Sequence, residues 1–446
     1  MATVGDRAVV CGASMAGLLA ARVLADFYGP VTIVERDALP EAAAQRRGVP
    51  QGRHLHQLLR PGSTVLEDFF PGVFDELLAA GANVIDDPSL GYVGVGNHVL
   101  TQSGPFAKPL ELQAYAVSRP LLECRVRQRV RALPNVVFRQ DCDVVEPVLG
   151  SSGRITAVRV ADRRDGKERE LPTDLVVDAT GRSARTPAWL RTHGYDVPDE
   201  QRYSVELTYA SQWLRIPDGA LAETVVAVAP TLERSTGAGL LTYEDGLTVL
   251  TLIGVAGGRL PSDLPGLLRA AAEFLPARIV DAVRSAEPIG EVVVQRYPAS
   301  VWRRYDKLRR LPGGLLVMGD AVCSLNPVYG QGMTSAALQA KALRRSLAGA
   351  HGDDVGRHYF RAAARKVAPL WQANRLNDFA LAPTTGWRTV PQRLVNWYTD
   401  KLAAAAAEDI VLAEAFMRMV NLVDPPARLL TPSLTRRVVS GNRRRN

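Results

Sequence analysis

The segment from Ala8 to Glu35 limits the fold more than any other part of the sequence. Ala8–Cys11 is a short apolar run typical of a buried parallel strand, and Ser14–Tyr28 has the pattern of a helix. A second apolar run, Val31–Val34, ends at Glu35. This strand, turn, helix and strand predict an α/β fold with a Rossmann-like domain.

The turn in this unit reads Gly12-Ala-Ser14-Met-Ala-Gly17, a dinucleotide-binding pattern in which serine replaces the middle glycine. Gly12 suits the tight turn, Gly17 allows the helix to approach the strand, and the helix N-terminus offers N–H groups to a pyrophosphate. Glu35 stands where a carboxylate can accept both ribose hydroxyls, and it disfavours a 2′-phosphate. A glycine-containing unit without a ligand is the alternative.

Two more strands end in glycine turns. Leu175–Val177 precedes Asp178-Ala-Thr-Gly181, and Leu315–Met318 precedes Gly319-Asp320, with a helix expected from Gly332 to Ser346. Three such strand ends, far apart in sequence, can converge on one extended ligand.

Composition excludes several classes of protein. The chain has 446 residues, 47% hydrophobic and 22% charged, as a globular protein has, and no long apolar run predicts a membrane span or signal peptide. The net charge is +8, and the basic residues are scattered among 46 acidic ones, apart from a cluster at Arg443–Asn446. We expect this cluster to be a frayed tail. We therefore expect a cytoplasmic protein with no nucleic-acid partner.

The cysteines predict neither a metal site nor a disulfide framework. The four cysteines lie far apart without a C-x-x-C pair. No His or Cys lies near Cys323 in sequence to activate it, so we expect Cys323 to be a small packing residue.

Residues 186–300 have the alternation of an antiparallel sheet, with Asp245-Gly246 as a hairpin turn. One apolar face of this sheet is expected to line a pocket for a lipophilic substrate; the alternative is that its side chains only pack on helices. The pocket residues expected from this face are Leu207, Tyr209, Trp213, Leu241 and Tyr243.

Taken together, the three glycine turns resemble those of the flavoprotein monooxygenases of the p-hydroxybenzoate hydroxylase fold. The motifs GxSxxG with its Glu, D-A-T-G, and G-D-A followed by P and G-x-G occur in that family's order over residues 6–345. The resemblance implies that Asp320 reaches the ribityl chain and pyrophosphate of FAD. It also implies that the Pro327–Gly332 loop lies beside the isoalloxazine, and that Arg119 of "VSRPLLECRV" approaches FAD.

Two segments resemble a narrower, actinobacterial branch that contains the monensin- and lasalocid-type polyether epoxidases. They are "GVPQGRHLH" and "GDAVCSLNPVYGQGM". This resemblance implies that Arg46, Gln51, His54 and His56 lie near the flavin edge, and the first three are candidate catalytic residues beside the reactive flavin. For the histidines, capping a loop or binding backbone is the alternative.

The resemblance implies an FAD-dependent monooxygenase that epoxidises alkenes of a polyketide or terpenoid, in natural-product or antibiotic biosynthesis, through a flavin C4a-hydroperoxide. An aromatic hydroxylase and an isoprenoid double-bond reductase are the alternatives. Cys323 stands where aromatic hydroxylases have His, and Thr180 where they have Asp. Because the second change removes a carboxylate, electrons from NAD(P)H are expected either directly or through a separate flavin reductase. The other expected partners are dioxygen and at most a second copy of the chain.

These arguments divide the chain into FAD-binding parts at 1–185 and 301–346, a substrate-binding sheet at 186–300 and a helical region at 347–446. The expected cofactor-binding residues are Gly12, Ser14, Gly17, Glu35, Arg36, Arg46, Arg119, Gly181, Gly319, Asp320, Pro327, Gly330, Gln331, Gly332 and Met333.

Overall fold

The computed structural model describes residues 4–231, 233–255, 257–349, 352, 354–381 and 390–445. The expected α/β fold with a Rossmann-like domain is confirmed by a five-stranded parallel sheet. Its order is β17 (Leu315–Val317), β11 (Leu175–Asp178), β1 (Ala8–Cys11), β2 (Val31–Val34) and β7 (Val136–Arg139).

The register of this sheet brings the three glycine turns to one edge. Cys11 pairs with both Val34 and Asp178, and Asp178 pairs with Val317, so the strands end at the same level. The N–H of Gly12 donates to the carbonyl of Val34 at 2.8 Å. A ligand at this edge is therefore within reach of residues from all three turns.

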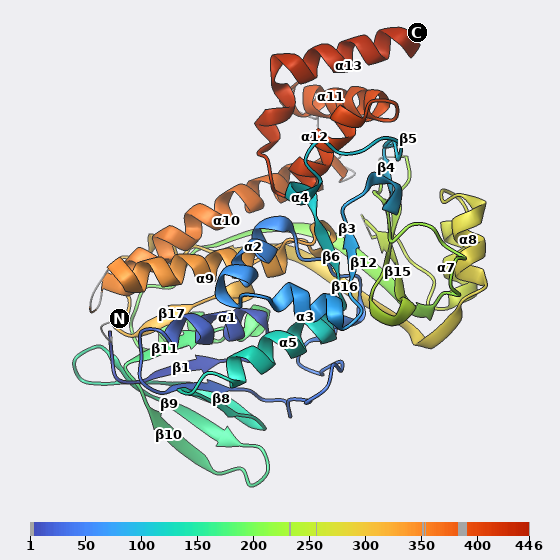
Figure 1. The fold of residues 1–446 in the computed structure, drawn as a ribbon. Coiled ribbons are helices and arrows are strands. Elements are labelled where there is room, and N and C mark those ends of the chain that lie inside the picture. The colour runs from blue at the N-terminus through green and yellow to red at the C-terminus, as the bar shows by residue number, and fades with distance from the viewer. Residues whose placement is uncertain are drawn as a thin grey trace.

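Helices cover one face of the parallel sheet, and an antiparallel sheet covers the other (Figure 1). The helices are α1 (Met15–Leu24), α2 (Arg60–Phe69), α3 (Val73–Ala79), α5 (Arg119–Arg131), α9 (Gly332–Gly349) and α10 (Asp354–Leu381). The opposite sheet contains β8 (Cys142–Leu149), β9 (Ile155–Asp162) and β10 (Glu168–Pro172), in a region where the sequence analysis expected no separate sheet.

The second large unit is an eight-stranded sheet. Its order is β18 (Cys323–Ser324), β16 (Glu287–Arg303), β12 (Glu200–Arg215), β15 (Leu247–Gly254), β14 (Thr236–Thr242), β13 (Val225–Val228), β4 (Gly91–Val95) and β5 (His98–Val99). The predicted hairpin joins β14 to β15, with positive φ angles of 54° at Asp245 and 68° at Gly246. Both edges of this sheet come from outside residues 186–300, because β4, β5 and β18 belong to ranges expected in the FAD-binding parts.

The two faces of this sheet have different neighbours. Ala210 and Leu214 of β12 pack with residues of α7 (Leu264–Ala271) and α8 (Ala277–Arg284), two helices that the strand pattern had not revealed. Leu207 and Tyr209 project to the other face and pack with Tyr297 and Val328. The face expected to be apolar therefore points to the flavin-side loop, and helices cover the opposite face.

The C-terminal region is helical, as predicted. After α10 come α11 (Val390–Ala406), α12 (Ile410–Val420) and α13 (Pro432–Arg445), so the arginine cluster near the end belongs to a helix and not to a frayed tail. These helices share a core with Leu100 of the segment after β5, and Thr101 N–H donates to the Ala406 carbonyl at 3.0 Å. Two short helices, α4 (Pro109–Leu112) and α6 (Thr186–Thr192), and the small sheet of β3 (Asn83–Ile85) and β6 (Ala114–Ala116) complete the fold.

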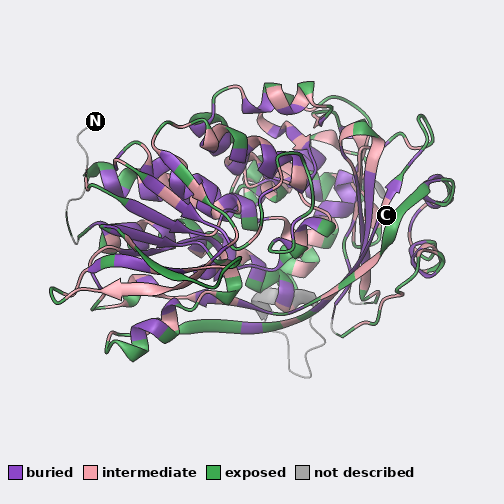
Figure 2. Cartoon of the chain, turned by 90° about the horizontal axis from the view of Figure 1, so that it is seen from below, coloured by how far each residue is buried: buried purple, intermediate pink, exposed green. Residues whose placement is uncertain are grey.

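Burial follows these units. Figure 2 shows the buried residues concentrated in the parallel sheet with its helices and in the middle of the eight-stranded sheet. Among the described helices, none combines the length and the apolar composition needed to cross a membrane.

Candidate functional site

The glycine turn after β1 leaves no room for a side chain at Gly12 or at Gly17. Gly12 has a φ of 101°, and a Cβ there would lie 2.8 Å from the carbonyl oxygen of Ala179 in the second turn. A Cβ on Gly17 would lie 1.8 Å from the carbonyl oxygen of Gly12. Both glycines are thus required by close packing of α1, β1 and the turn after β11.

Ser14, in the place of the middle glycine, is tied to two residues of α5. Its hydroxyl donates to Glu123 Oε2 at 3.1 Å and accepts from Arg119 at 2.8 Å. The side chain does not cap α1, although Ser14 occupies the N-cap position. The N-terminal N–H groups of α1 therefore stay available to an anion.

Glu35 is held at the end of β2. Its carboxylate accepts from the N–H of Ala13 at 2.7 Å and from the N–H of Asp37 at 3.0 Å. The guanidinium of Arg46 lies 3.5 Å from the same carboxylate. These contacts orient Glu35 beside the glycine turn, where ribose hydroxyls can reach it.

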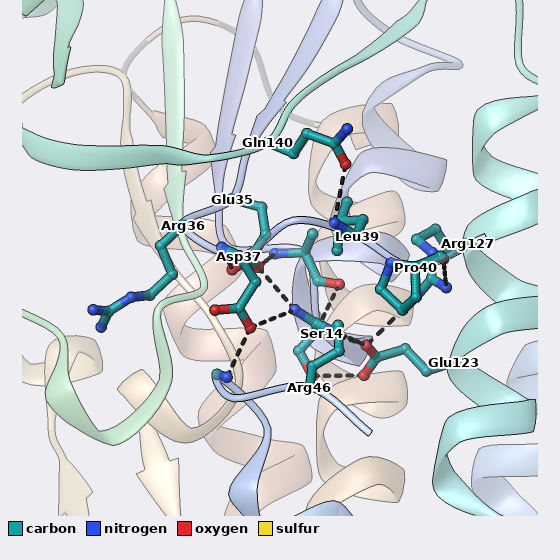
Figure 3. A network of polar contacts seen from close by, with 12 residues as sticks. Ser14, Glu35, Arg36, Asp37, Leu39, Pro40, Arg46, Glu123, Arg127 and Gln140 are labelled. Atoms are coloured by element: carbon teal, nitrogen blue, oxygen red, sulfur yellow. Dashed lines mark hydrogen bonds and ion pairs between the residues drawn. The ribbon is translucent and has the colours of Figure 1, made fainter. Parts of the chain in front are cut away.

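Arg46 is the centre of a buried ionic network (Figure 3). It binds Glu123 at 2.5 and 2.8 Å, lies 3.3 Å from Asp37, and donates to the Ala13 carbonyl at 3.3 Å. The neighbouring carboxylates raise the pKa of Arg46 even though burial alone would lower it. The side chain acts here as an organiser of acidic residues around the glycine turn.

Glu123 binds more of the network's arginines than any other carboxylate described here, and the sequence analysis missed it together with Asp37 and Arg127. Its carboxylate lies 3.2 Å from Arg119 and 3.8 Å from Arg127, in addition to Arg46. Burial raises the pKa of Glu123, but Arg119 and Arg46 outweigh burial, and the net pKa lies below its usual value. The i, i+4 spacing of Arg119 and Glu123 on one helix was the available signal, although such pairs are common on helix surfaces.

Arg36, an expected cofactor residue, stands outside this network. Its side chain is 62% exposed and lies 3.9 Å from Asp143, and Figure 3 shows it pointing away from Arg46. It lines the same cavity as Glu35.

The third turn brings a carboxyl group to the opposite side of the glycine turn. Gly319 has a φ of 72° and a Cβ there would lie 2.7 Å from the Ala16 side chain, while its N–H donates to Gln339 at 2.9 Å. Burial raises the pKa of Asp320, and the nearby charges of Arg182 and Arg119 lower it in part. Such a carboxyl needs hydrogen-bond donors, which the hydroxyls of a ribityl chain supply.

The loop between β18 and α9 contains the remaining expected cofactor residues. Pro327, Gly330, Gln331, Gly332 and Met333 all line the cavity. Gly330 has a φ of 64°, and no atom lies within 4 Å of a Cβ built on Gly332 or on Gly181. The N-terminus of α9 is thus open to the cavity, as a binding site for an extended anion requires.

These features fit FAD. One cavity with a volume of about 3150 Å³ is lined by Gly12, Ser14, Glu35, Arg119 and Asp320, and its wall also contains the two open glycines, Gly181 and Gly332. Glu35 suits the ribose, the N-terminus of α1 the pyrophosphate, and Asp320 the ribityl chain. Gly17 is not in the cavity wall but packs behind it.

The candidate catalytic residues occupy different positions on this wall. Gln51 lies on the short turn Pro50–Arg53 and faces the cavity. His54 is buried, with Nδ1 2.7 Å from Ser211 and Nε2 3.0 Å from Gln295. Burial lowers the pKa of His54. A neutral imidazole whose two nitrogens both have protein partners is not a free base in this arrangement.

His56 has a different environment from His54. Its Nδ1 donates to the carbonyl of His54 at 2.8 Å, and its backbone N–H donates to the hydroxyl of Tyr243 at 2.8 Å. Burial, with help from Arg119, lowers the pKa of His56 to about 3. The ring is therefore neutral and holds the loop conformation.

Of the five expected pocket residues, two line the cavity and three do not. Tyr209 and Leu241 line the cavity. Leu207 is buried beside Tyr209, while Trp213 and Tyr243 pack together behind the His54 loop. The Trp213 indole donates to the Arg53 carbonyl at 2.9 Å, and the Tyr243 hydroxyl donates to the His56 carbonyl at 2.9 Å. These last two side chains support the loop from behind.

Thr180 and Cys323 are the two departures from the aromatic hydroxylase pattern. The Thr180 hydroxyl donates to Asp178 at 2.6 Å, so it turns back onto its own strand. Cys323 is buried, and burial raises the pKa of its thiol well above the usual value. Within the described residues, no group of three His, Cys, Asp or Glu side chains could hold a metal ion.

Comparisons with known proteins agree with this geometry. Kynurenine 3-monooxygenase of Salinispora arenicola is 28% identical over 455 residues, covering 92% of this chain and 93% of that protein. The structure of p-nitrophenol 4-monooxygenase PnpA from Pseudomonas putida aligns with a TM-score of 0.66 at 15% identity, covering 95% and 98%. No protein-family profile matches the chain.

The fold is the one that flavin-dependent monooxygenases of the p-hydroxybenzoate hydroxylase fold share, and the site fits FAD as the cofactor. Protein Rv3254 of Mycobacterium tuberculosis is 42% identical over 434 residues, covering 94% of this chain and 90% of that protein. The chain belongs to the same family as Protein Rv3254. None of these similarities confirms the expected polyether epoxidase branch.

Proposed function

We propose that the chain uses FAD to epoxidise an alkene of a large lipophilic substrate, such as a polyketide or terpenoid. The observation that carries this proposal is the extent of the cavity. It begins at the FAD-binding turns and continues along β4 and β13 to α11 and α12, where its lining includes Val93, Val226, Trp397, Phe416 and Met419.

The volume supports a large substrate. Pockets for a single small ligand measure roughly 300–1,000 Å³. The cavity here measures about 3150 Å³, which leaves space beyond one bound dinucleotide. Because the walls away from the FAD-binding turns are mainly apolar side chains, a substrate with a long hydrocarbon framework fits them best.

The residues of the chain would divide the work between holding FAD and enclosing the substrate. The helix N-termini, Glu35 and Asp320 would bind the cofactor, which supplies the reduced ring that activates dioxygen. Tyr209, Leu241 and the apolar strands would exclude water and hold the alkene against the flavin edge.

Epoxidation suits the environment of His54, which is not free to act as a base. An alkene attacks an electrophilic oxygen with its own π electrons, whereas a phenol reacts best after deprotonation. His54 already uses both ring nitrogens for Ser211 and Gln295. Aromatic hydroxylation is the second candidate, favoured by the 28% identity to kynurenine 3-monooxygenase.

A labelling experiment separates the candidates. The protein with FAD, NADPH and an added flavin reductase would be incubated under isotopically labelled dioxygen with squalene, kynurenine or p-nitrophenol. We expect labelled epoxide from the polyene and none from the two aromatic compounds. Label in an aromatic product alone would establish a hydroxylase, and a saturated product formed without dioxygen would establish a reductase.

A further inference from the structure

The loop Asn326–Gln331, between β18 and α9, is held in a defined conformation. Asn326 caps the short turn Pro327–Tyr329 by accepting from the N–H of Val328 at 3.0 Å, and Gly330 closes the turn with a φ of 64°. Val328, Tyr329 and Gly330 line the cavity at the flavin side. The position of this loop therefore affects any flavin bound there.

Asp378 on α10 binds both ends of that turn. Its Oδ1 accepts from Asn326 Nδ2 at 2.7 Å and from the Tyr329 hydroxyl at 2.8 Å. Asp378 is only 8% exposed, so these bonds form away from water. One carboxyl oxygen thus fixes the residue before the turn and the residue that ends it.

Asn374 makes a second contact between α10 and this loop, one helical turn before Asp378. It lies four residues before Asp378, on the same face of α10, and its Nδ2 donates to Gln331 Oε1 at 2.8 Å. Asn374 is 0% exposed and Gln331 is 7% exposed. Figure 1 shows α10 running along α9, whose N-terminus follows Gln331 directly.

We propose that Asp378 and Asn374 are positioning residues that fix the flavin-side loop, so that the C-terminal helix α10 sets the environment of the bound FAD. We name this pair the α10 clamp. The inference rests on the FAD site, and it assigns to the C-terminal region a role in the flavin site itself.

The chemistry of Asp378 makes the clamp testable by a conservative change. Its Oδ2 has no hydrogen-bond partner, although the Tyr203 hydroxyl faces the same carboxyl. Burial raises the pKa of Asp378, and hydrogen bonds from Tyr329, Asn326 and Tyr203 lower it in part. An amide in this place keeps the oxygen that accepts both bonds, so the clamp does not require the negative charge.

The test compares Asp378→Asn, Asp378→Ala and Asn374→Ala with Gln372→Ala, a matched control on the exposed side of α10. FAD affinity would be measured by quenching of flavin fluorescence, and the visible spectrum and midpoint potential of the bound flavin would be recorded. Losing buried hydrogen bonds to the loop should weaken FAD binding about tenfold and shift the spectrum and potential. Asp378→Asn and Gln372→Ala should match the unaltered protein.

Each result has a distinct meaning. An Asp378→Ala protein with unchanged FAD affinity, spectrum and potential would overturn the clamp. An Asp378→Asn protein that behaves like Asp378→Ala would overturn it too, because charge and not loop geometry would then matter. If Asp378→Ala does not fold, Tyr329→Phe and Asn374→Ala carry the same test. Failure of the unaltered protein to bind FAD would instead overturn the cofactor assignment.

Discussion

Glu123 shows how much depends on one side chain beside the glycine turn. Its carboxylate faces Arg46, Arg119 and Arg127, and all four side chains are at most 6% exposed. Arg46 in turn holds Glu35 and Asp37. Glu35, the carboxylate expected to bind the ribose, is therefore positioned through a second, more deeply buried carboxylate.

Replacing Glu123 with alanine should destabilise the protein strongly. Removing one partner from a buried ionic network costs about 3–5 kcal/mol, because the remaining charges are left unpaired. Urea unfolding monitored by circular dichroism measures this loss. The matched control is Asp26→Ala, which breaks the more exposed Arg22–Asp26 pair and should cost about 0.3–0.5 kcal/mol. Equal losses in the two variants would refute the role of Glu123.

Gly17 and Gly332, which come from two of the glycine motifs, should respond differently to replacement by alanine. Gly17→Ala places a Cβ 1.8 Å from a backbone oxygen, so we expect a protein that does not fold stably. Gly332→Ala meets no atom within 4 Å, so the apoprotein should keep its thermal stability. Its added methyl group should nevertheless obstruct the approach of FAD to α9 and weaken binding about tenfold or more. Normal FAD binding by Gly332→Ala, measured by flavin fluorescence, would contradict the placement of FAD.

At the scale of single elements, the loop Arg46–Leu59 joins the two halves of the site. Its first half reaches the acidic network through Arg46, and its second half rests on the eight-stranded sheet through His54 and His56. This loop therefore contacts both the sheet edge expected to bind FAD and the eight-stranded sheet expected to line the substrate pocket.

The loop should become sensitive to acid through His56. Its pKa is about 3 in the folded protein and near 6.5 when unperturbed, so the unfolded chain binds a proton first as the pH falls. Stability is therefore present above pH 6.5 and is lost on acidification towards pH 3. Between pH 6.5 and about 5.5 the extra loss should be about 1 kcal/mol relative to His56→Gln. Urea unfolding across this range measures it, with His358→Gln as the exposed control; parallel pH profiles for His56→Gln and the unaltered protein would exclude this coupling.

The elements that could be predicted from sequence are those with a local signal. Ala8–Cys11, Val31–Val34 and the helix after Gly332 are marked by apolar runs and glycine turns, and the structure places them within a few residues. The pairing of β4 with β13 had no local signal, because it joins residues distant in the chain. Asp378 and Asn374 were missed for the same reason: their partners lie on other elements. Glu123 did have a local signal, its spacing from Arg119 on α5, but pairs with this spacing are common on helix surfaces.

At the scale of the whole molecule, the cavity touches every large unit. The parallel sheet supplies the glycine turns, the eight-stranded sheet supplies Tyr209 and Leu241, and the C-terminal helices supply Trp397 and Phe416. Neither sheet alone encloses this cavity. The helical C-terminal region also contains the α10 clamp.

The source of electrons is a property of this whole arrangement. The aromatic hydroxylases that the sequence resembles are expected to have a carboxylate at the position of Thr180, whereas here the Thr180 hydroxyl and N–H both bind Asp178. Without that carboxylate, we expect NADPH alone to reduce the bound FAD slowly, and a separate flavin reductase to restore rapid reduction. Anaerobic stopped-flow absorbance of the flavin band measures both rates.

The variant Thr180→Asp tests the cause directly, because it restores a carboxylate at an exposed position of the turn. It should raise the rate of direct reduction by about tenfold or more, equivalent to about 1.4 kcal/mol of barrier. Arg185→Ala, a change elsewhere on the same cavity wall, controls for general disturbance of the segment. Rapid bleaching of the unaltered protein by NADPH alone would show that direct reduction of the flavin does not need a carboxylate at position 180.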